Sequence, residues 1–338
     1  MEKGNQDRFF SHNQKKIIAE LGEKKLLEAL RKMLLIRNFE VRGESAYLQG
    51  KIGGFFHSYM GQEAIQVSAV QVFGPKNWWI TSYRCHALAL LLGATSDELM
   101  AELFGRITGN AKGRGGSMHF YTDRMLGGFG VVAGQIPAAT GAAFALKYQN
   151  IKDQAAICFL GDGAVAQGVF HESLNMASLW DLPCIFIIEN NHWGMGTAIE
   201  KAVCVKRLAE DKAPSFNIKG YTLDGMDYFN CYAGFKEIYQ EVIKTSRPVL
   251  VEAITDRFRG HSISDPGLYR TKEELKETMV RGPLILLRDA LIEAKILDEA
   301  TYKEMDKEMR EKMIASLEYA DESPWPDPIS LEEDVFAP

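Results

Sequence analysis

Apolar residues along the chain form two alternating patterns. Short, nearly continuous apolar runs predict strands that are buried on both faces, as in a parallel sheet. Between these runs, apolar residues recur every three or four positions, which is the spacing of helices that cover such a sheet. The predicted strands are 77–82, 155–160, 184–189, 221–223 and 248–255, and the predicted helices are 64–73, 137–148, 167–180 and 234–244. This alternation indicates the α/β class, with a doubly wound, mainly parallel sheet.

Helical patterns also flank the predicted sheet. On the N-terminal side, apolar residues from Leu26 to Leu34 recur at helical spacing. On the C-terminal side, Thr271 and Glu274 form a capping box that begins a helical tail. We therefore expect a helical extension over 1–50, an α/β domain over 51–270 and a helical tail over 271–338 that packs on the same domain.

One segment fits neither pattern. Residues 105–134 are rich in glycine and show little periodicity, which predicts a long loop. Just before this segment, a capping box of Thr95 and Glu98 predicts the start of a helix that runs through Phe104. Long loops in a compact domain often carry function, so we expect this segment to contribute to a site.

The composition excludes several classes of protein. Hydrophobic residues make up 46% of the 338 residues, as in a globular core, and the net charge of −6 provides no basic surface for nucleic acid. The apolar runs are shorter than the roughly 20 residues that cross a bilayer, and the first residues lack the apolar core of a signal peptide. We therefore expect neither a nucleic-acid nor a membrane partner, and a location in the bacterial cytoplasm or in the matrix of an organelle after maturation.

The five cysteines favour neither a disulfide framework nor a structural zinc site, because they are widely spaced and form no CxxC pair. Most of them read as small core residues. Cys85 beside His86 is a candidate nucleophile with its base. On a strand, however, adjacent side chains point to opposite faces, and this disfavours such a pair.

Two polar motifs directly follow predicted strands. Asp162 lies between two glycines after the strand 155–160, and Asn190 and Asn191 follow the strand 184–189. The carboxyl ends of parallel strands share one edge of the sheet, where ligands gather. Carboxylate and amide oxygens suit magnesium or calcium bound to phosphate oxygens. The alternative is structural, with Asp162 as the cap of the next helix and the asparagines in an ordinary loop.

The GDG motif, followed at this distance by the asparagine pair, resembles the signature of thiamine-diphosphate enzymes. Further segments narrow the resemblance to the alpha subunits of the decarboxylase component of pyruvate dehydrogenase, and it covers nearly the whole chain after residue 25. These segments are GFFHSYMGQEA (54–64), TSYRCHALAL (81–90), AKGRGGSMHFY (111–121), LPCIFIIENNHWGMGT (182–197) and FRGHSISDPGLYRT (258–271). The implied fold is a sheet of the thiamine-diphosphate-binding type.

The resemblance implies roles for residues around the diphosphate. Asp162, Asn191 and the backbone carbonyl of Trp193 would hold magnesium. The diphosphate itself would contact the backbone amides of Gly163 and Ala164. Tyr83 and Arg84 would reach the same group, a task that suits the forked and permanently charged guanidinium of arginine.

The other end of the cofactor has implied contacts of its own. Gly130 and Val132 would contact the aminopyrimidine ring. His57 would lie near the cofactor, and His261 would lie by the diphosphate and the substrate channel, with a role in passing the acyl group onward. We therefore take His57 and His261 as the candidate catalytic residues.

The resemblance is incomplete in three places. Ala166 stands where the family commonly has asparagine, and Trp193 stands where tyrosine is common; a backbone ligand tolerates the second change. Ser262 and Ser264 resemble a region that is phosphorylated in some relatives, and a phosphate there would repel a neighbouring diphosphate. The stretch 267–269 is one residue shorter than in those relatives and lacks a serine, so phosphorylation is left unassigned.

The implied activity is oxidative decarboxylation of pyruvate and transfer of the acetyl group to a lipoyl acyltransferase, which yields acetyl-CoA in the full complex. Thiamine diphosphate and magnesium are the implied cofactors, and the cofactor carries the carbon chemistry. In this family a second subunit, beta, supplies the glutamate that activates the cofactor, so an α₂β₂ assembly is implied. Branched-chain 2-oxo acid and acetoin dehydrogenase alpha subunits are the alternatives within the resemblance.

Two alternatives come from other classes. Residues 128–133 match the GxGxxA fingerprint of nicotinamide dehydrogenases. That fingerprint should follow a strand, whereas the residues before it are polar and turn-like, so we expect no strand there. A non-catalytic binding subunit on the same fold is the second alternative, and the Asp162 and Asn191 pair argues against it.

Overall fold

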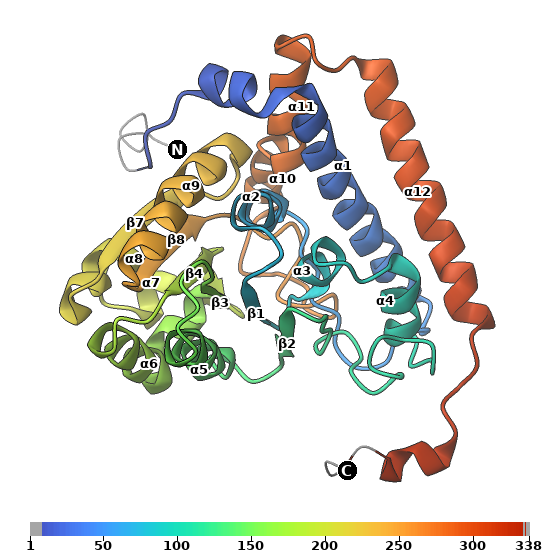
Figure 1. Ribbon diagram of the computed structural model, residues 1–338. Coiled ribbons are helices and arrows are strands. Elements are labelled where there is room, and N and C mark those ends of the chain that lie inside the picture. The colour runs from blue at the N-terminus through green and yellow to red at the C-terminus, as the bar shows by residue number, and fades with distance from the viewer. Residues whose placement is uncertain (1–8, 334, 336–338) are drawn as a thin grey trace.

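A parallel sheet of six strands forms the centre of the computed structural model, which describes residues 9–333 and 335 (Figure 1). The strands are β1 (Trp78–Ser82), β2 (Met125–Phe129), β3 (Ala156–Gly161), β4 (Cys184–Asn190), β7 (Lys219–Asp224) and β8 (Val249–Ile254). Their order across the sheet is β2-β1-β3-β4-β8-β7, and every neighbouring pair is parallel. The predicted fold class, a doubly wound α/β sheet, is confirmed.

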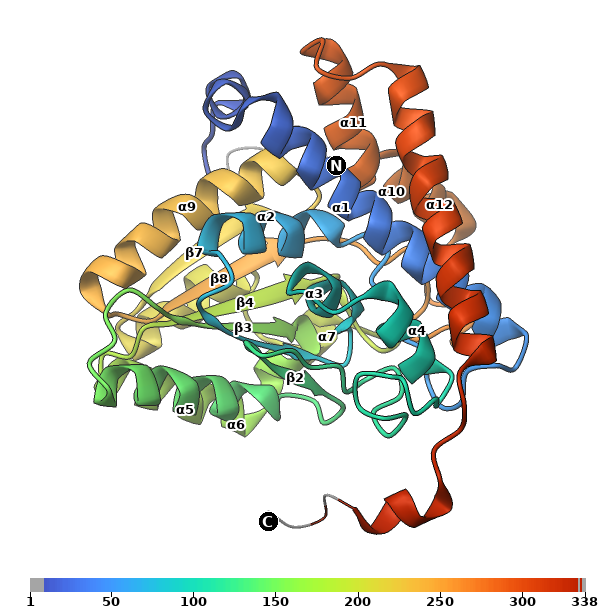
Figure 2. The ribbon, with the colours of Figure 1, turned by 45° about the vertical axis from the view of Figure 1, so that its right-hand side comes forward.

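Helices cover both faces of the sheet. Helices α2 (Glu63–Phe73) and α9 (Tyr228–Thr245) lie over one face, and α5 (Gln135–Tyr148) and α6 (Gly168–Leu179) lie over the other (Figure 2). Alternate residues of β3 join different cores, because successive side chains point to opposite faces. Phe159 packs in the same core as α2, and Leu160 packs in the core on the side of α5. This two-sided burial explains the nearly continuous apolar runs of the sequence.

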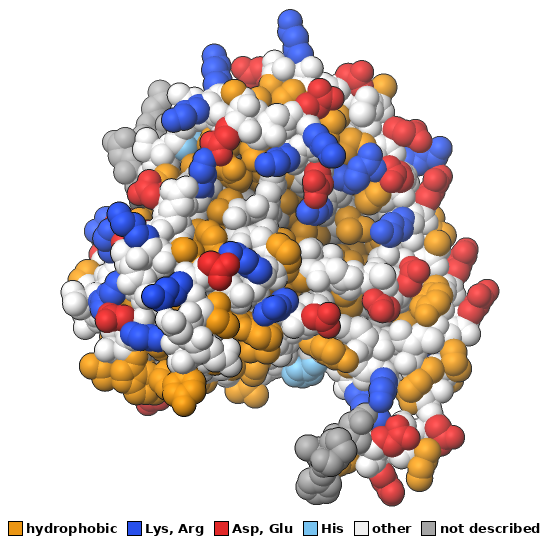
Figure 3. Space-filling model, viewed as in Figure 1, with side chains coloured by type: hydrophobic (Ala, Val, Ile, Leu, Met, Phe, Trp, Pro, Cys, Tyr) orange, Lys and Arg blue, Asp and Glu red, His pale blue; other side chains and the backbone are white. Residues whose placement is uncertain are grey.

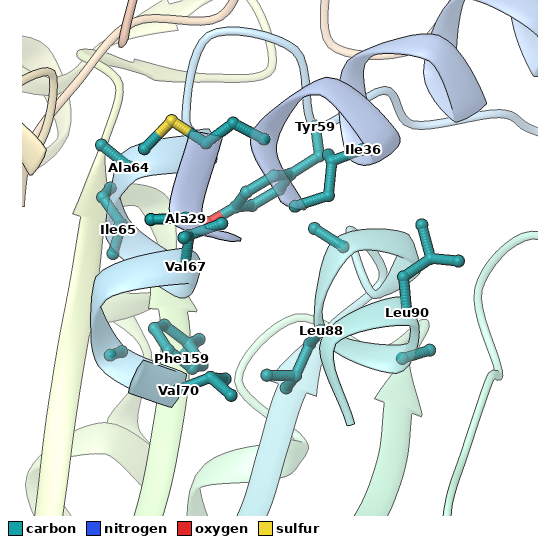
Figure 4. Packing of buried hydrophobic residues seen from close by; sticks show 14 of the residues in the cluster. Ala29, Ile36, Tyr59, Ala64, Ile65, Val67, Val70, Leu88, Leu90 and Phe159 are labelled. Carbon is teal, nitrogen blue, oxygen red and sulfur yellow. The ribbon is translucent and has the colours of Figure 1, made fainter. Parts of the chain in front are cut away.

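The core that contains Phe159 and α2 continues into the N-terminal and C-terminal helices. The long helix α1 (Gln14–Leu48) has a kink at Gly22, whose φ is 70°, and it buries Ala29 and Ile36 beside Tyr59 (Figure 4). Helix α12 (Glu299–Glu322) runs along α1 and reaches α4 (Ser96–Leu103), as Figure 1 shows. The remaining helices of the C-terminal part are α10 (Lys272–Val280), α11 (Pro283–Glu293) and the 3₁₀ helix η4 (Pro328–Glu332).

The described termini agree with the predicted helical character. Both capping boxes are present, at the starts of α4 and α10. The division of the chain near residues 50 and 270 stays a prediction, and residues 1–8, 334 and 336–338 lie outside the described part. Among the described helices, none is long and apolar enough to cross a membrane.

The structure corrects two predictions made for single segments. The segment predicted as one long loop, 105–134, contains strand β2, which pairs with β1 at the border of the sheet. The strand predicted at 77–82 is present as β1 and ends at Ser82, whereas the strand geometry assumed for Cys85 and His86 is wrong, because His86 begins helix α3 (His86–Leu91). Short elements join the larger ones: β5 (Trp193–Gly194), β6 (Thr197–Ala198), α7 (Ile199–Ala202), α8 (Leu208–Lys212), η2 (Asp162–Ala166) and η3 (Ala213–Phe216).

The structure describes the surroundings of all five cysteines. All five are free, and all except Cys204 are buried. Burial raises the pKa of the Cys85 thiol to about 12, and the thiol contacts the carbonyl oxygen of Ser117. Cys85 is therefore a core residue, and the nucleophile alternative is not supported.

Candidate functional site

A cavity of about 540 Å³ lies at the carboxyl ends of the strands, and its volume is within the range of roughly 300–1,000 Å³ typical of small-molecule sites. Residues after β1, β2, β3, β4 and β8 line it, because parallel strands deliver their carboxyl ends to the same edge. All the residues to which the resemblance gave roles around the cofactor lie on its wall. They are His57, Tyr83, Arg84, Gly130, Val132, Asp162, Gly163, Ala164, Asn191, Trp193 and His261.

Asp162 and Asn191 line this cavity, and each has one buried oxygen atom without a hydrogen-bond partner in the part of the chain that the structure describes. Asp162 follows β3 directly and Asn191 follows the adjacent strand β4, and their side chains are 2% and 6% exposed. Oδ2 of Asp162 and Oδ1 of Asn191 have no hydrogen-bond partner within the described residues, and we call them the open oxygens. Burial raises the pKa of the Asp162 carboxyl, while the charge of Arg257 opposes that rise. A buried oxygen without a partner is costly, so this arrangement suits a bound cation.

The two asparagines at the end of β4 have different tasks. The side chain of Asn190 donates to Glu252 Oε1 at 2.7 Å and accepts from the backbone N–H of His192 at 3.0 Å, which fixes the turn after the strand. The Asn191 amide instead donates to Gln62 Oε1 at 3.1 Å. That bond orients Asn191 so that its carbonyl oxygen is the open one.

The turn after β4 carries Trp193 into the wall of the cavity. His192 adopts a positive φ of 68°, and Trp193 then pairs with Ala198 in the small sheet of β5 and β6. The indole ring packs on Tyr269, with 4.7 Å between ring centroids. A Cβ atom on Gly163 would lie 3.3 Å from the Cα atom of Gly194, so the two segments approach closely where glycine stands.

Arg84 ties the end of β1 to two other segments. Its guanidinium donates to the carbonyl oxygens of Ser58 at 2.7 Å and His261 at 2.5 Å, and the residue is 5% exposed. The Tyr83 ring lies 4.5 Å from the ring of His57, measured between centroids. These contacts place a permanent positive charge and a phenol in the wall of the cavity.

His57 and His261 lie together, as two candidate catalytic residues would. Their ring centroids are 5.1 Å apart. Burial and the nearby charge of Arg84 lower the pKa of His57 to about 2, and the same causes lower the pKa of His261 to about 4. Both imidazoles are therefore neutral near pH 7, and Nδ1 of His57 has no hydrogen-bond partner in the described part of the chain.

Arg257 is a cavity residue that the sequence reasoning missed. It follows β8 by three residues, is 2% exposed and contacts His261 Nδ1 at 3.2 Å. It also donates to the Met195 carbonyl oxygen at 3.1 Å and to the Tyr269 hydroxyl at 3.0 Å. Burial lowers its pKa to about 10, which leaves the guanidinium charged at neutral pH. Two signals in the sequence could have identified Arg257. It comes shortly after a predicted strand, where ligands gather, and it directly precedes the segment 258–271 that carried the resemblance.

Glu189 is a second residue that the sequence reasoning missed. It lies at the end of β4, lines the cavity and is 3% exposed. One carboxylate oxygen accepts from the Tyr59 hydroxyl and from Gln66 Nε2. Burial raises the pKa of Glu189 to about 7. No sequence signal marks this residue, since it reads as the last position of an apolar strand.

The segment around β2 forms a different kind of wall. Met118, Gly130, Val132 and Ala133 line the cavity, and none of them carries an ionisable group. The ionisable groups belong to the ends of β1, β3, β4 and β8 instead. The cavity therefore has an ionic end, suited to an anion with a cation, and an apolar wall, suited to an organic ring.

Of the residues at which the resemblance was incomplete, Trp193 lines this cavity, and Ala166, Ser262 and Ser264 are not among its lining residues. Ala166 ends η2 with its side chain exposed, outside the residues that line the wall. Ser262 is 5% exposed, and its hydroxyl oxygen lies 2.9 Å from that of Ser264. Nothing in these contacts assigns either serine a modification.

The fingerprint at 128–133 follows a strand after all, since it overlaps the end of β2. In a dinucleotide site the acidic residue that holds the ribose follows the fingerprint by about 20 residues, and here the acidic residue at that distance is Asp153. Asp153 lies before the start of β3 and pairs with Lys76 at the opposite edge. The nicotinamide alternative therefore lacks its ribose-binding residue at the expected place.

The donor set fits a cation that binds oxygen. Within 9–333 and 335, no cluster of three or more histidine, cysteine or acidic side chains could hold a metal ion by itself. The open oxygens supply one carboxylate and one amide, which is too few for zinc but fits magnesium whose coordination is completed by phosphate oxygens.

Comparisons with known proteins agree with this geometry. The sequence model of the family described as "Dehydrogenase E1 component" matches residues 31–329. The chain is 42% identical over 315 residues to the pyruvate dehydrogenase E1 component subunit alpha of Rickettsia felis, with 92% of this chain and 95% of that protein covered. It is 39% identical over 322 residues to the protein of the same name from Rhizobium meliloti, with 94% and 92% covered. The chloroplastic subunit alpha-3 of Arabidopsis thaliana is 39% identical over 318 residues, with 92% and 74% covered.

Proposed function

The chain belongs to the dehydrogenase E1 component family, and we propose that it is the alpha subunit of a pyruvate dehydrogenase, which binds magnesium and thiamine diphosphate. With its partner it would decarboxylate pyruvate oxidatively and pass the acetyl group to a lipoyl acyltransferase. The names of the relatives and the five sequence segments support pyruvate as the substrate.

One observation carries the cofactor assignment. The open oxygens of Asp162 and Asn191 are buried at the ends of adjacent strands, and both residues line the same cavity. A buried carboxylate oxygen without a hydrogen-bond partner raises the free energy of the protein, and binding of a cation relieves that cost. We assign magnesium to these two atoms and to the backbone carbonyl of Trp193.

The other residues of the cavity would bind different parts of the cofactor. Arg84, Tyr83 and the backbone amides of Gly163 and Ala164 would hold the diphosphate, and Arg257 adds a second guanidinium at the same end. The apolar wall around Gly130 and Val132 would receive the aminopyrimidine ring.

When bound, thiamine diphosphate supplies the nucleophilic carbon and the electron sink for decarboxylation. This chain anchors and orients it, and the neutral imidazoles of His57 and His261 provide groups that can hold or accept a proton near the substrate.

A partner subunit completes this proposal. The alpha-subunit relatives imply a beta subunit, and we propose an α₂β₂ assembly in which beta supplies the glutamate that activates the cofactor. An exposed apolar surface supports an assembly: hydrophobic side chains gather over α5 and α6, as Figure 3 shows at the lower left. They include Phe144, Tyr148, Met176, Leu179 and Trp180. Apolar surfaces of this kind mark interaction sites.

The test is a substrate panel on the assembled enzyme. The chain would be purified with its beta subunit and supplied with a lipoyl acceptor, magnesium and thiamine diphosphate. We expect the highest kcat/KM with pyruvate, compared with branched-chain 2-oxo acids and acetoin, and no decarboxylation by this chain alone. A preference for a branched-chain acid or acetoin would overturn the assignment of pyruvate as the substrate. Robust turnover by the lone chain would overturn the two-subunit proposal.

A further inference from the structure

Glu102 is a buried carboxylate outside the cavity, and it organises the glycine-rich segment that follows it. The residue lies on α4 and is 0% exposed. Its Oε2 accepts from the backbone N–H groups of Ala111 at 2.8 Å and Gly113 at 2.9 Å. Its Oε1 accepts from those of Gly115 at 2.6 Å and Gly116 at 3.2 Å. Four backbone donors thus converge on one carboxylate, an arrangement that stabilises negative charge.

The chain wraps this carboxylate too closely for larger residues. A Cβ atom on Gly109 would lie 2.3 Å from Glu102 Oε2, and one on Gly115 would lie 3.3 Å from Oε1. Gly113 and Gly116 have φ values of 78° and 55°, which favour glycine. Four glycines, Gly109, Gly113, Gly115 and Gly116, are therefore explained by their packing around or hydrogen bonds to the carboxylate. Figure 2 shows the segment as the coil below α4.

A continuous set of contacts leads from this coil to the apolar wall of the cavity. The carbonyl oxygen of Ser117 lies 3.0 Å from His86 Nε2, and the other ring nitrogen of His86 lies 3.0 Å from Glu40 Oε1. The next residue, Met118, lines the cavity. His119 Nδ1 then lies 3.0 Å from the carbonyl oxygen of Gly128, two residues before Gly130.

We propose that Glu102 is a positioning residue for the cofactor, and this inference rests on the proposed function. By holding residues 111–116, Glu102 fixes where Met118 and Gly130 stand, and these residues form the wall that receives the thiamine rings. Glu102 contacts neither the cavity nor the ionic end around Asp162. Its effect therefore falls on the organic part of the cofactor and spares the diphosphate.

The substitution Glu102→Gln tests this division. Glutamine keeps the shape but replaces one acceptor oxygen with an NH₂ donor, which faces the N–H groups of the coil. Binding would be measured by calorimetry on the assembled enzyme with magnesium and two probes, thiamine diphosphate and inorganic diphosphate. We expect the Kd for thiamine diphosphate to rise about tenfold or more, as is typical when a group that holds a ligand-contacting residue is lost. The Kd for inorganic diphosphate should stay that of the wild type.

The chain offers a matched control and a second variant. Glu98→Gln changes an exposed residue one turn earlier on α4, where glutamine also satisfies a capping box, and it should bind both probes as the wild type does. Gly115→Ala disturbs the same coil while Glu102 keeps its carboxylate, because the added Cβ would lie 2.9 Å from the His119 carbonyl oxygen and 3.3 Å from Glu102 Oε1. It should reproduce the selective loss, which keeps the proposal testable if Glu102→Gln does not fold.

The outcomes separate the two levels of the proposal. Equal affinity for thiamine diphosphate in the wild type, Glu102→Gln and Gly115→Ala would overturn the role of Glu102. An equal loss of affinity for thiamine diphosphate and for inorganic diphosphate would also overturn this role, because such a loss would show a general structural effect. If the wild-type enzyme itself does not bind thiamine diphosphate, the proposed function fails instead.

Discussion

Replacing His57 with glutamine should make the stability of the protein less sensitive to acid. His57 is 6% exposed, and its burial and the charge of Arg84 lower its pKa from 6.5 to about 2. In the unfolded chain the imidazole gains a proton below pH 6.5, whereas in the folded protein it stays neutral. Because the pKa of His57 is lower in the folded protein than in the unfolded chain, this group leaves the free energy of unfolding unchanged above pH 6.5. It lowers the free energy of unfolding progressively as the pH falls from 6.5 towards 2. Glutamine has no such proton to gain.

The size of the effect follows from these two values. At pH 5.5 the unfolded chain holds the His57 proton in a ratio of about 10 to 1, which lowers the free energy of unfolding by about 1.4 kcal/mol. At pH 7.5 the same contribution is below about 0.1 kcal/mol. The change between the two pH values should therefore be about 1.4 kcal/mol smaller for His57→Gln than for the wild type.

Urea unfolding followed by circular dichroism at pH 7.5 and 5.5 would measure this difference. Phe55→Leu is a suitable control, because the Phe55 ring lies 6.1 Å from that of His57 and carries no proton that titrates. It should retain the acid sensitivity of the wild type. An equal loss of stability on acidification in the wild type and in His57→Gln would refute the reasoning.

Three further predictions concern the site and the core. Arg257→Met should weaken binding of inorganic diphosphate about tenfold or more in calorimetry, because it removes a buried charged donor; unchanged affinity would exclude Arg257 from the ionic end. Trp193→Tyr should leave the affinity for magnesium and thiamine diphosphate within about twofold, since a backbone carbonyl is the proposed ligand; a large loss would show that the indole itself is needed. Gly43→Ala should lower the free energy of unfolding in urea by about 1–2 kcal/mol, because its Cβ would lie 2.6 Å from the Phe56 ring; a stabilised protein would show that helix propensity outweighs this clash.

Much of the fold follows from local pattern. Strands β3, β4 and β8 were predictable because both of their faces are buried, which leaves apolar runs such as 184–189. Asp162 and Asn191 were predictable as neighbours for the same reason, since adjacent parallel strands end at the same edge. These inferences depend on short-range order that a single sequence displays.

The rest depends on contacts that the sequence does not display. Strand β2 has the sequence MLGGF, and its two glycines weaken any strand signal, so only pairing with β1 reveals it. The place of Arg257 depends on Met195 and Tyr269, which come from two separate loops. The glycines of 105–134 read as a loop signal, although several of them serve the carboxylate of Glu102.

The most direct test of the cofactor site is the dependence of thiamine diphosphate binding on magnesium. Calorimetry on the assembled enzyme would compare the wild type with Asp162→Asn, and Asp153→Asn would serve as the control because it changes an exposed aspartate before β3. We expect the wild type and the control to bind thiamine diphosphate with magnesium and to lose that binding in EDTA, and Asp162→Asn to lose it in both conditions. Equally tight binding by Asp162→Asn, or by the wild type in EDTA, would contradict the magnesium site at Asp162 and Asn191.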